Sequence, residues 1–233
     1  MSSEGAKNNV FVLLGAPGSG KGTVSAMCIE NFGWKQLSTG NLCRKHIAEQ
    51  TEIGKQIDFV LKSGKLVSDS IIIDMVNQWL SEQLSLGKTV LLDGYPRNSV
   101  QAKALDDFLQ EDTHKQVGFA VVKLEVPDDV VVGRLSNRRV CQNKSCQAVY
   151  SVAENSGCKP KHDMVCDKCG TALEIRNDDK PEVVAERLRV YREHERALLD
   201  FYKAQGQNII TISAGRPLGE VFDSFKKKVG LED

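Results

Sequence analysis

Residues Gly15–Thr23, with the sequence GAPGSGKGT, decide the fold, because they join a short apolar run to a helical segment. The run Val10–Leu14 is typical of a buried strand, and residues 22–32 favour a helix. Between a strand and a helix, glycines let backbone N–H groups turn toward a bound phosphate, and the helix N-terminus adds partial positive charge. The sequence therefore predicts a phosphate-binding loop (P-loop), whose nucleotide contacts come from Gly18, Ser19, Gly20, Lys21, Gly22 and Thr23.

One departure from the general P-loop pattern concerns the metal. Gly22 stands between Lys21 and Thr23, whereas the pattern puts the hydroxyl residue directly after the lysine. We therefore expect weaker direct ligation of Mg²⁺ by Thr23, so that a carboxylate elsewhere takes over part of that task. Asp93 is the candidate, because it ends an apolar run and because hydrated Mg²⁺ is held in proteins by one or two carboxylates.

Strands and helices alternate along the rest of the chain. Apolar runs predict further buried strands at 90–92, 119–126 and 208–212. Helical spacing of apolar residues predicts helices at 70–84, 100–109, 128–135 and after Asp179. This order predicts an α/β protein with three layers (α/β/α) and a parallel sheet covered on both faces. Residues 137–179 break the pattern with many turn formers and few apolar runs, and they predict an inserted subdomain.

Four of the seven cysteines are clustered in that insertion. Cys141 and Cys146 are separated by four residues, and Cys166 and Cys169 by two, which lies within the spacing of structural zinc sites. Four thiolates would complete the coordination sphere, so the predicted metal is structural rather than catalytic. Two alternatives stay open at this point: one ligand could be replaced by Cys158 or His162, or the thiols could be reduced and free of metal.

Composition excludes several function classes. Lys and Arg together number 31, as do Asp and Glu, so no global basic field recruits nucleic acid or a membrane surface. Residues 1–9 are polar, which predicts neither a secretory signal nor a transit peptide. No apolar run approaches the ~20 residues that span a bilayer. A cytoplasmic location is therefore expected.

Five motifs in a fixed order resemble those of the adenylate kinase family. They occupy residues 15–23, 37–44, 64–69, 93–97 and 176–179, which read GAPGSGKGT, LSTGNLCR, GKLVSD, DGYPR and RNDD. The resemblance implies reversible transfer of the terminal phosphoryl group from Mg-ATP to AMP, giving two ADP, by a monomer. It also implies a division into a P-loop core (1–37, 69–136 and 180–233), a helical NMP-binding arm (38–68) and a zinc-binding lid (137–179).

The resemblance further assigns roles to arginines, whose charged fork binds phosphate bidentately. Arg44 and Arg97 would hold the AMP phosphate. Arg138 and Arg176 would close over the transferring group from the lid, and Arg187 would reach both phosphate chains. The residues implied in catalysis are Lys21, Arg97, Arg138, Arg176 and Arg187.

Base contacts are implied in the same way. On the ATP side, Arg134 would stack on the base, and the other implied contacts are Val149, Tyr150 and Arg216. The implied AMP pocket is lined by Thr39, Lys65, Leu66, Val67, Gly94, Tyr95 and Pro96. Gln101 offers an amide donor and an acceptor to an adenine edge, whereas the similar UMP/CMP kinases have Asn at that position. Gln101 therefore favours AMP as the acceptor.

Two alternative functions remain open from the sequence. GTP could be the phosphoryl donor, because the donor base is contacted largely by backbone and by arginine stacking. A zinc-ribbon binding module coupled to a nucleotide switch would use the cysteines together with Lys159, Lys161 and Lys168. The balanced charge argues against the second alternative, since nucleic-acid binders normally present a basic face.

Overall fold

The computed structural model describes residues 8–62, 67–143, 145–154, 156–176 and 179–231. It divides into two compact units, which are described separately. Unit 1 consists of Met1–Leu14, Lys21–Lys123 and His194–Thr211. Unit 2 consists of Gly15–Gly20, Leu124–Glu193 and Ile212–Asp233. Among the helices of the described residues, none is long and apolar enough to cross a lipid bilayer.

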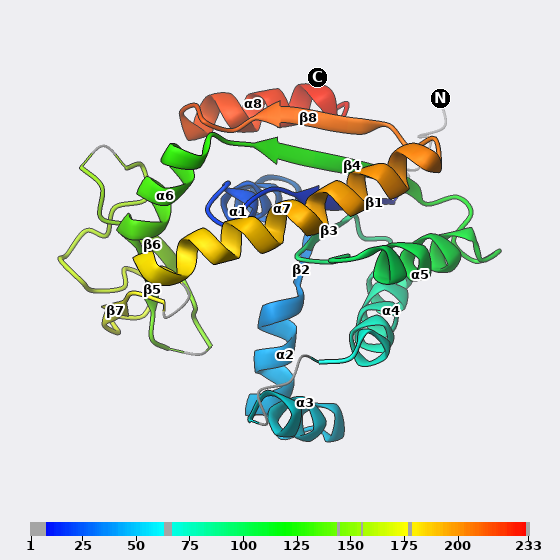
Figure 1. Cartoon of the computed structure of the whole chain (residues 1–233), viewed down its shortest axis with the longest axis horizontal. Coiled ribbons are helices and arrows are strands. Elements are labelled where there is room, and N and C mark those ends of the chain that lie inside the picture. Colours follow the sequence, from blue (N-terminus) through cyan, green and yellow to red (C-terminus); the bar gives the residue numbers. More distant parts are fainter. Residues whose placement is uncertain (1–7, 63–66, 144, 155, 177–178, 232–233) are drawn as a thin grey trace. The chain divides into compact units, whose positions relative to one another are not determined.

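A five-stranded sheet with the order β2-β3-β1-β4-β8 forms the centre of the fold (Figure 1). Its strands are β1 (Asn9–Leu14), β2 (Lys35–Ser38), β3 (Val90–Asp93), β4 (Gly118–Glu125) and β8 (Ile209–Ser213). β1 pairs in parallel with β3 and with β4, and β2 pairs in parallel with β3. The predicted parallel sheet is therefore confirmed. Within this five-stranded sheet, β2 is the strand that was not predicted, because just one of its four residues, Leu37, is buried.

Alternating side chains of these strands face two hydrophobic layers, as the pleat requires. On one face, Val12 and Leu92 belong to a core that also contains residues of α4 (Asp69–Ser85), of α5 (Ser99–Gln110) and of the second half of α7 (Pro181–Ala204). On the other face, Phe11 stacks on Trp34 with ring centroids 5.1 Å apart. Helix α1 (Lys21–Phe32) follows the loop after β1 and contacts β2 and β3.

Two short helices of unit 1 form a hairpin after β2 (Figure 1). They are α2 (Thr39–Ala48) and α3 (Glu52–Lys62), which pack against each other. Their close approach requires glycine at position 54, since a Cβ atom there would lie 2.0 Å from the backbone oxygen of His46. The hairpin falls within the range 38–68 predicted as a helical arm.

Unit 2 contains a small antiparallel sheet with the order β6-β5-β7. Its strands are β5 (Arg138–Cys141), β6 (Val149–Ser151) and β7 (Leu173–Glu174), all within the predicted insertion. Helix α6 (Asp128–Asn137) packs on the first half of α7 through the buried side chains of Val131, Leu135, Val184 and Leu188. The last helix is α8 (Leu218–Lys228).

Candidate active site

The loop after β1 has the backbone geometry that its glycines predict. Gly15, Gly18 and Gly20 have φ values of +154°, +81° and +100°. A Cβ atom on Gly15 would lie 2.5 Å from Ser19 Oγ and 2.9 Å from the Leu124 carbonyl oxygen, so no larger residue fits there. The Ser19 N–H donates to the Ala16 carbonyl at 2.9 Å and closes the turn. Within the described residues, the buried Ser19 hydroxyl has no hydrogen-bond partner, which leaves it available to a ligand.

Arg134 lies beside this loop in unit 2. Its Nη2 donates to the Ala214 carbonyl at 2.9 Å, and its Nη1 lies 3.5 Å from the Ser19 carbonyl oxygen. Burial lowers the pKa of Arg134 from its usual value. Arg216, two residues beyond Ala214, is exposed and pairs with Glu220 at 3.7 Å. Two of the predicted ATP contacts, Arg134 and Arg216, therefore belong to the same unit as residues 15–20 of the loop.

Asp179 joins two of the predicted phosphate-binding arginines. Its carboxylate is fully buried and accepts from Arg138 Nε at 2.6 Å, while Arg138 Nη2 also donates to it. Arg187 Nη1 donates to the same carboxylate at 3.0 Å. Arg176, which is half-buried, accepts the Asp179 N–H on its carbonyl oxygen at 3.0 Å. From the sequence, Asp179 was expected at the start of a helix and at the end of the motif 176–179, and its role as the shared partner of Arg138 and Arg187 was missed.

A second cluster, in unit 1, surrounds the turn after β3. The carbonyl oxygen of Gly94 accepts from Thr39 Oγ1 and from Arg97 Nε, each at 3.0 Å. A Cβ atom on Gly94, whose φ is +80°, would lie 3.3 Å from Thr39 Oγ1 and 3.4 Å from Arg97 Nη2. Asp93 ends β3 with a half-buried carboxylate, which accepts from Gln36 Nε2 at 3.3 Å. Three predicted AMP-site residues, Thr39, Gly94 and Arg97, are thus brought together.

Gln101 continues this cluster into α5. Its side chain is buried, its Oε1 accepts from the Arg97 N–H at 2.9 Å, and its Nε2 donates to Asp69 Oδ1 at 2.7 Å. Asn98 caps α5 by accepting the Gln101 N–H on Oδ1, and its Nδ2 donates to both oxygens of Asp69 at 3.1 Å. The buried Tyr95 hydroxyl donates to the Gln101 carbonyl at 3.2 Å. Burial, with a smaller contribution from the Asp69 charge, raises the pKa of Tyr95.

The remaining predicted AMP contacts are less closely tied to this cluster. Arg44 is exposed and hydrogen-bonds the Asn41 side chain. Val67 is half-buried, whereas Lys65 and Leu66 lie outside the described residues. Asp69 ends the motif 64–69, but neither it nor Asn98 was predicted as a partner of Gln101, because nothing in their spacing relates them to that residue.

The four clustered cysteines meet in space. Their sulfur atoms all lie within 4.8 Å of one another, with 3.4 Å between Cys141 and Cys169 and 3.7 Å between Cys146 and Cys166. Tetrahedral zinc with Zn–S bonds of about 2.3 Å places its sulfur ligands about 3.8 Å apart, so the geometry fits that metal. In the described part of the chain, neither Cys158 nor His162 joins the group.

Tyr150 is part of the surroundings of this cysteine cluster. Its buried hydroxyl accepts the Asp167 N–H at 2.9 Å and lies 3.4 Å from Cys166 Sγ. Burial raises the pKa of Tyr150 to about 12. The hydroxyl of this predicted ATP contact is therefore engaged at the cysteine cluster, whereas the neighbouring Val149 is exposed.

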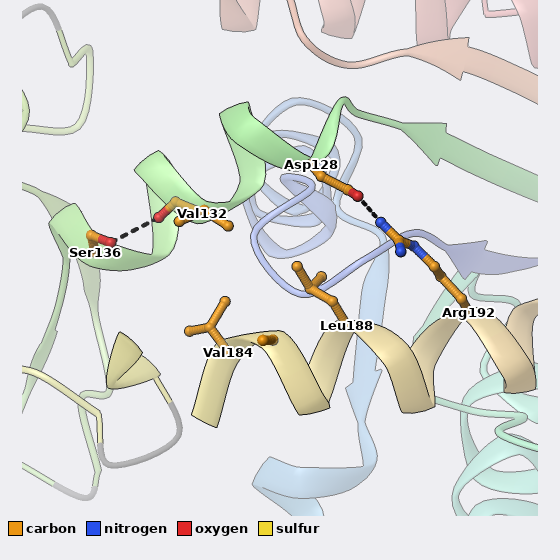
Figure 2. A pocket seen from close by; sticks show the side chains of 7 residues that line it. Asp128, Val132, Ser136, Val184, Leu188 and Arg192 are labelled. Atoms are coloured by element: carbon orange, nitrogen blue, oxygen red, sulfur yellow. Dashed lines mark hydrogen bonds and ion pairs between the residues drawn. The ribbon is translucent and has the colours of Figure 1, made fainter. Parts of the chain in front are cut away.

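A cavity of about 380 Å³ lies between α6 and α7 (Figure 2). Its lining is mainly apolar, with Val132, Val184 and Leu188 in the middle and an Asp128–Arg192 ion pair at one side. None of the predicted site residues lines it. The candidate site is therefore defined by the polar residues around Asp179 and around the turn after β3, and not by this cavity.

Comparisons with known proteins agree with the arrangement of motifs. The family model described as adenylate kinase matches residues 13–207. The adenylate kinase of Streptomyces avermitilis is 43% identical over 223 residues, which cover 96% of this chain and 98% of the relative. That of Methanothrix thermoacetophila is 41% identical over 93% of this chain and 96% of its own, and that of Archaeoglobus fulgidus is 42% identical over 84% and 87%. The chain therefore belongs to the adenylate kinase family.

Proposed function

We propose that this phosphotransferase moves the terminal phosphoryl group of Mg-ATP to AMP, reversibly, to give two ADP. The observation that carries the choice of AMP is the cluster around the turn after β3. There, the backbone N–H of Arg97 donates to the side-chain amide oxygen of Gln101, and the guanidinium of Arg97 donates to the Gly94 carbonyl. One cation for a phosphate and one amide for a base edge, four residues apart, suit a nucleoside monophosphate that carries adenine.

The donor nucleotide is assigned to the P-loop. Gly18–Thr23 would surround the ATP phosphates with backbone N–H groups, Lys21 would neutralise the terminal phosphates, and Arg134 would stack on the base. The free hydroxyl of Ser19 and the half-buried position of Arg134 beside the loop support this assignment. Tyr150 and Val149 would complete the base side from the lid, and Arg216 from the segment after β8.

Magnesium is the metal that the reaction requires. Its chemistry is to neutralise the charge that develops between the β- and γ-phosphates. The carboxylate of Asp93 at the end of β3 suits a hydrated Mg²⁺, because it presents oxygen atoms and is only half-buried. We assign Asp93 to hold the ion through water.

The arginines would stabilise the transferring group. Phosphoryl transfer depends on positioning and charge neutralisation more than on covalent chemistry. Arg44 and Arg97 are assigned to the AMP phosphate, and Arg138, Arg176 and Arg187 to the transferring group. The Asp179 carboxylate supports this assignment, because it fixes Arg138 and Arg187 on a common partner and so presents their guanidinium groups together.

The residues 137–179 are proposed to act as a lid with a structural zinc ion. Cys141, Cys146, Cys166 and Cys169 would supply four thiolates, which leave no open position on the metal. A metal-linked lid would close as a stiff flap and exclude water from the reaction. We keep the division into a core, an arm at 38–68 and this lid as part of the proposal, together with a monomeric state.

The proposal is tested by measuring ADP formation across a panel of nucleoside monophosphates and triphosphates. We expect AMP to be the best acceptor and ATP to be an effective donor. Equal kcat/KM for AMP and UMP would overturn the acceptor assignment. A clear preference for GTP would overturn the donor assignment.

A further inference from the structure

The Asp69 carboxylate lies at the start of α4 and faces the start of α5. It accepts hydrogen bonds from two side-chain amides of α5, Gln101 Nε2 at 2.7 Å and Asn98 Nδ2 at 3.1 Å. An ionised carboxylate can only accept hydrogen bonds, so both amides must point their nitrogen atoms toward Asp69. We infer that Asp69 is a positioning residue that fixes the orientation of the Gln101 amide and thereby sets the preference for adenine over hypoxanthine and guanine.

The orientation of the Gln101 amide is determined at both of its ends. Its oxygen accepts the Arg97 N–H, and its nitrogen donates to Asp69. Turning the amide over would place an oxygen against the carboxylate and an NH₂ group against the Arg97 N–H, so both hydrogen bonds would become repulsive contacts. Asn98 adds to this restraint, because its Nδ2 lies 3.1 Å from each Asp69 oxygen and holds the carboxylate in place.

The fixed orientation leaves a defined pair of groups for a base. An amide oxygen has two acceptor sites and an amide nitrogen has two donor hydrogens, and each atom of Gln101 uses one of them inside the protein. One acceptor site and one donor hydrogen, on the two neighbouring atoms of the amide, remain for a base. This pair complements adenine, which offers the N6 amino group as donor and N1 as acceptor.

The same pair is mismatched with the other purines. Hypoxanthine and guanine present N1–H as a donor and O6 as an acceptor, so they require the inverted amide. Cytosine has the adenine-like order of donor and acceptor, and its rejection must therefore come from its smaller size.

The inference rests on the proposed function, since it concerns the base of the acceptor nucleotide.

The test compares AMP with IMP as acceptor in the wild type, in Asp69→Asn and in Asp74→Asn. Asp74 is an exposed acidic residue of the same helix, so its variant controls for the loss of one negative charge. In Asp69→Asn, the new amide can form a hydrogen bond with the Gln101 amide in either orientation of the latter. We expect the ratio of kcat/KM for AMP to that for IMP to fall by about tenfold or more, the size of one hydrogen bond to a charged group. KM for AMP should change more than kcat, and Asp74→Asn should keep the wild-type ratio.

An unchanged ratio in folded Asp69→Asn would overturn the inference. If that variant does not fold, the double variant Asp69→Asn/Gln101→Glu decides, because it exchanges amide and carboxylate and restores their hydrogen bond. The double variant should melt at a higher temperature than Gln101→Glu alone and should favour GMP over AMP more strongly. Equal melting temperatures and equal selectivities of the two would overturn the inference.

Failure of the proposed function gives a different result. In that case the wild type forms no ADP from ATP and AMP. Calorimetric titration of the same variants with AMP and IMP then measures the base preference without turnover. A wild-type preference for AMP that is lost in Asp69→Asn supports the role of Asp69, and equal preferences in the two proteins contradict it.

Discussion

Replacing Asp179 by asparagine tests whether one buried carboxylate holds two arginines. The Asp179 side chain is completely buried, whereas Arg138 is 17% and Arg187 is 28% exposed. Asparagine has nearly the same shape and keeps one acceptor oxygen, but it carries no charge. The substitution therefore leaves two guanidinium groups close together without their shared anion.

The expected loss of stability follows from this geometry. Removing one partner of a buried ion pair costs about 3–5 kcal/mol. Because asparagine keeps an acceptor and the arginines are partly exposed, we expect the lower end, about 3 kcal/mol. For a chain of this size, 1 kcal/mol corresponds to about 2–4 °C in Tm, so Tm should fall by about 6–12 °C.

Thermal and urea unfolding, followed by circular dichroism, measure this loss. Asp128→Asn is the matched control, because Asp128 pairs with Arg192 between α6 and α7 in the same unit, with both side chains 56% exposed. An exposed pair contributes about 0–1 kcal/mol, so the control should unfold nearly as the wild type does. Equal destabilisation by the two variants would refute the view that the buried Asp179 carboxylate stabilises the protein more than an exposed ion pair does.

Four further predictions concern the metal and the reaction. Protein purified without chelators should contain about one zinc ion per chain, and its removal should lower Tm because metal binding is coupled to folding of the lid; elemental analysis that finds no metal contradicts this. Tyr150→Phe should weaken zinc retention by about 10-fold or more in competition with a chelator, because it removes the hydroxyl beside Cys166, and unchanged retention counts against that role. Lys21→Ala should lose most phosphoryl transfer in a folded protein, and near-normal turnover would rule out its assignment. Arg176→Ala should lower kcat by about 10²–10³, with a smaller change in KM for ATP and little change in Tm; a loss of ATP affinity alone would instead mark Arg176 as a ground-state contact.

The elements that could be predicted are those whose own sequence specifies them. Residues 10–14 are continuously apolar and form the buried strand β1, and the helical spacing around 70–84 corresponds to α4. The strands that were not predicted, β2, β5, β6 and β7, are short and have little pattern of their own. β2 has one buried residue and β7 has two residues in all, so their conformation depends on pairing with β3 and β5.

The candidate site likewise contains residues that could be predicted from the sequence and contacts that could not. The cysteines could be predicted to meet, because zinc chemistry restricts their spacing, and the structure brings all four together. The pairing of Asp69 and Asp179 with their partners could not be predicted. Asp69 is 32 residues from Gln101 and Asp179 is 41 residues from Arg138, and only the packing of α4 on α5 and the folding of residues 137–179 bring these partners together.

The roles proposed for Asp69 and Asp179 nevertheless rest on one physical principle. The groups that the sequence predicts as ligand contacts, an amide and arginines, carry donors on long side chains with many rotamers. Immobilising such a side chain when a ligand binds costs about 0.5–1.5 kcal/mol. A buried or half-buried carboxylate can only accept hydrogen bonds, so it restrains these donors before the ligand arrives and reduces that cost. A motif therefore indicates which residues contact the nucleotide, whereas the tertiary structure supplies the acidic partners that hold them in position.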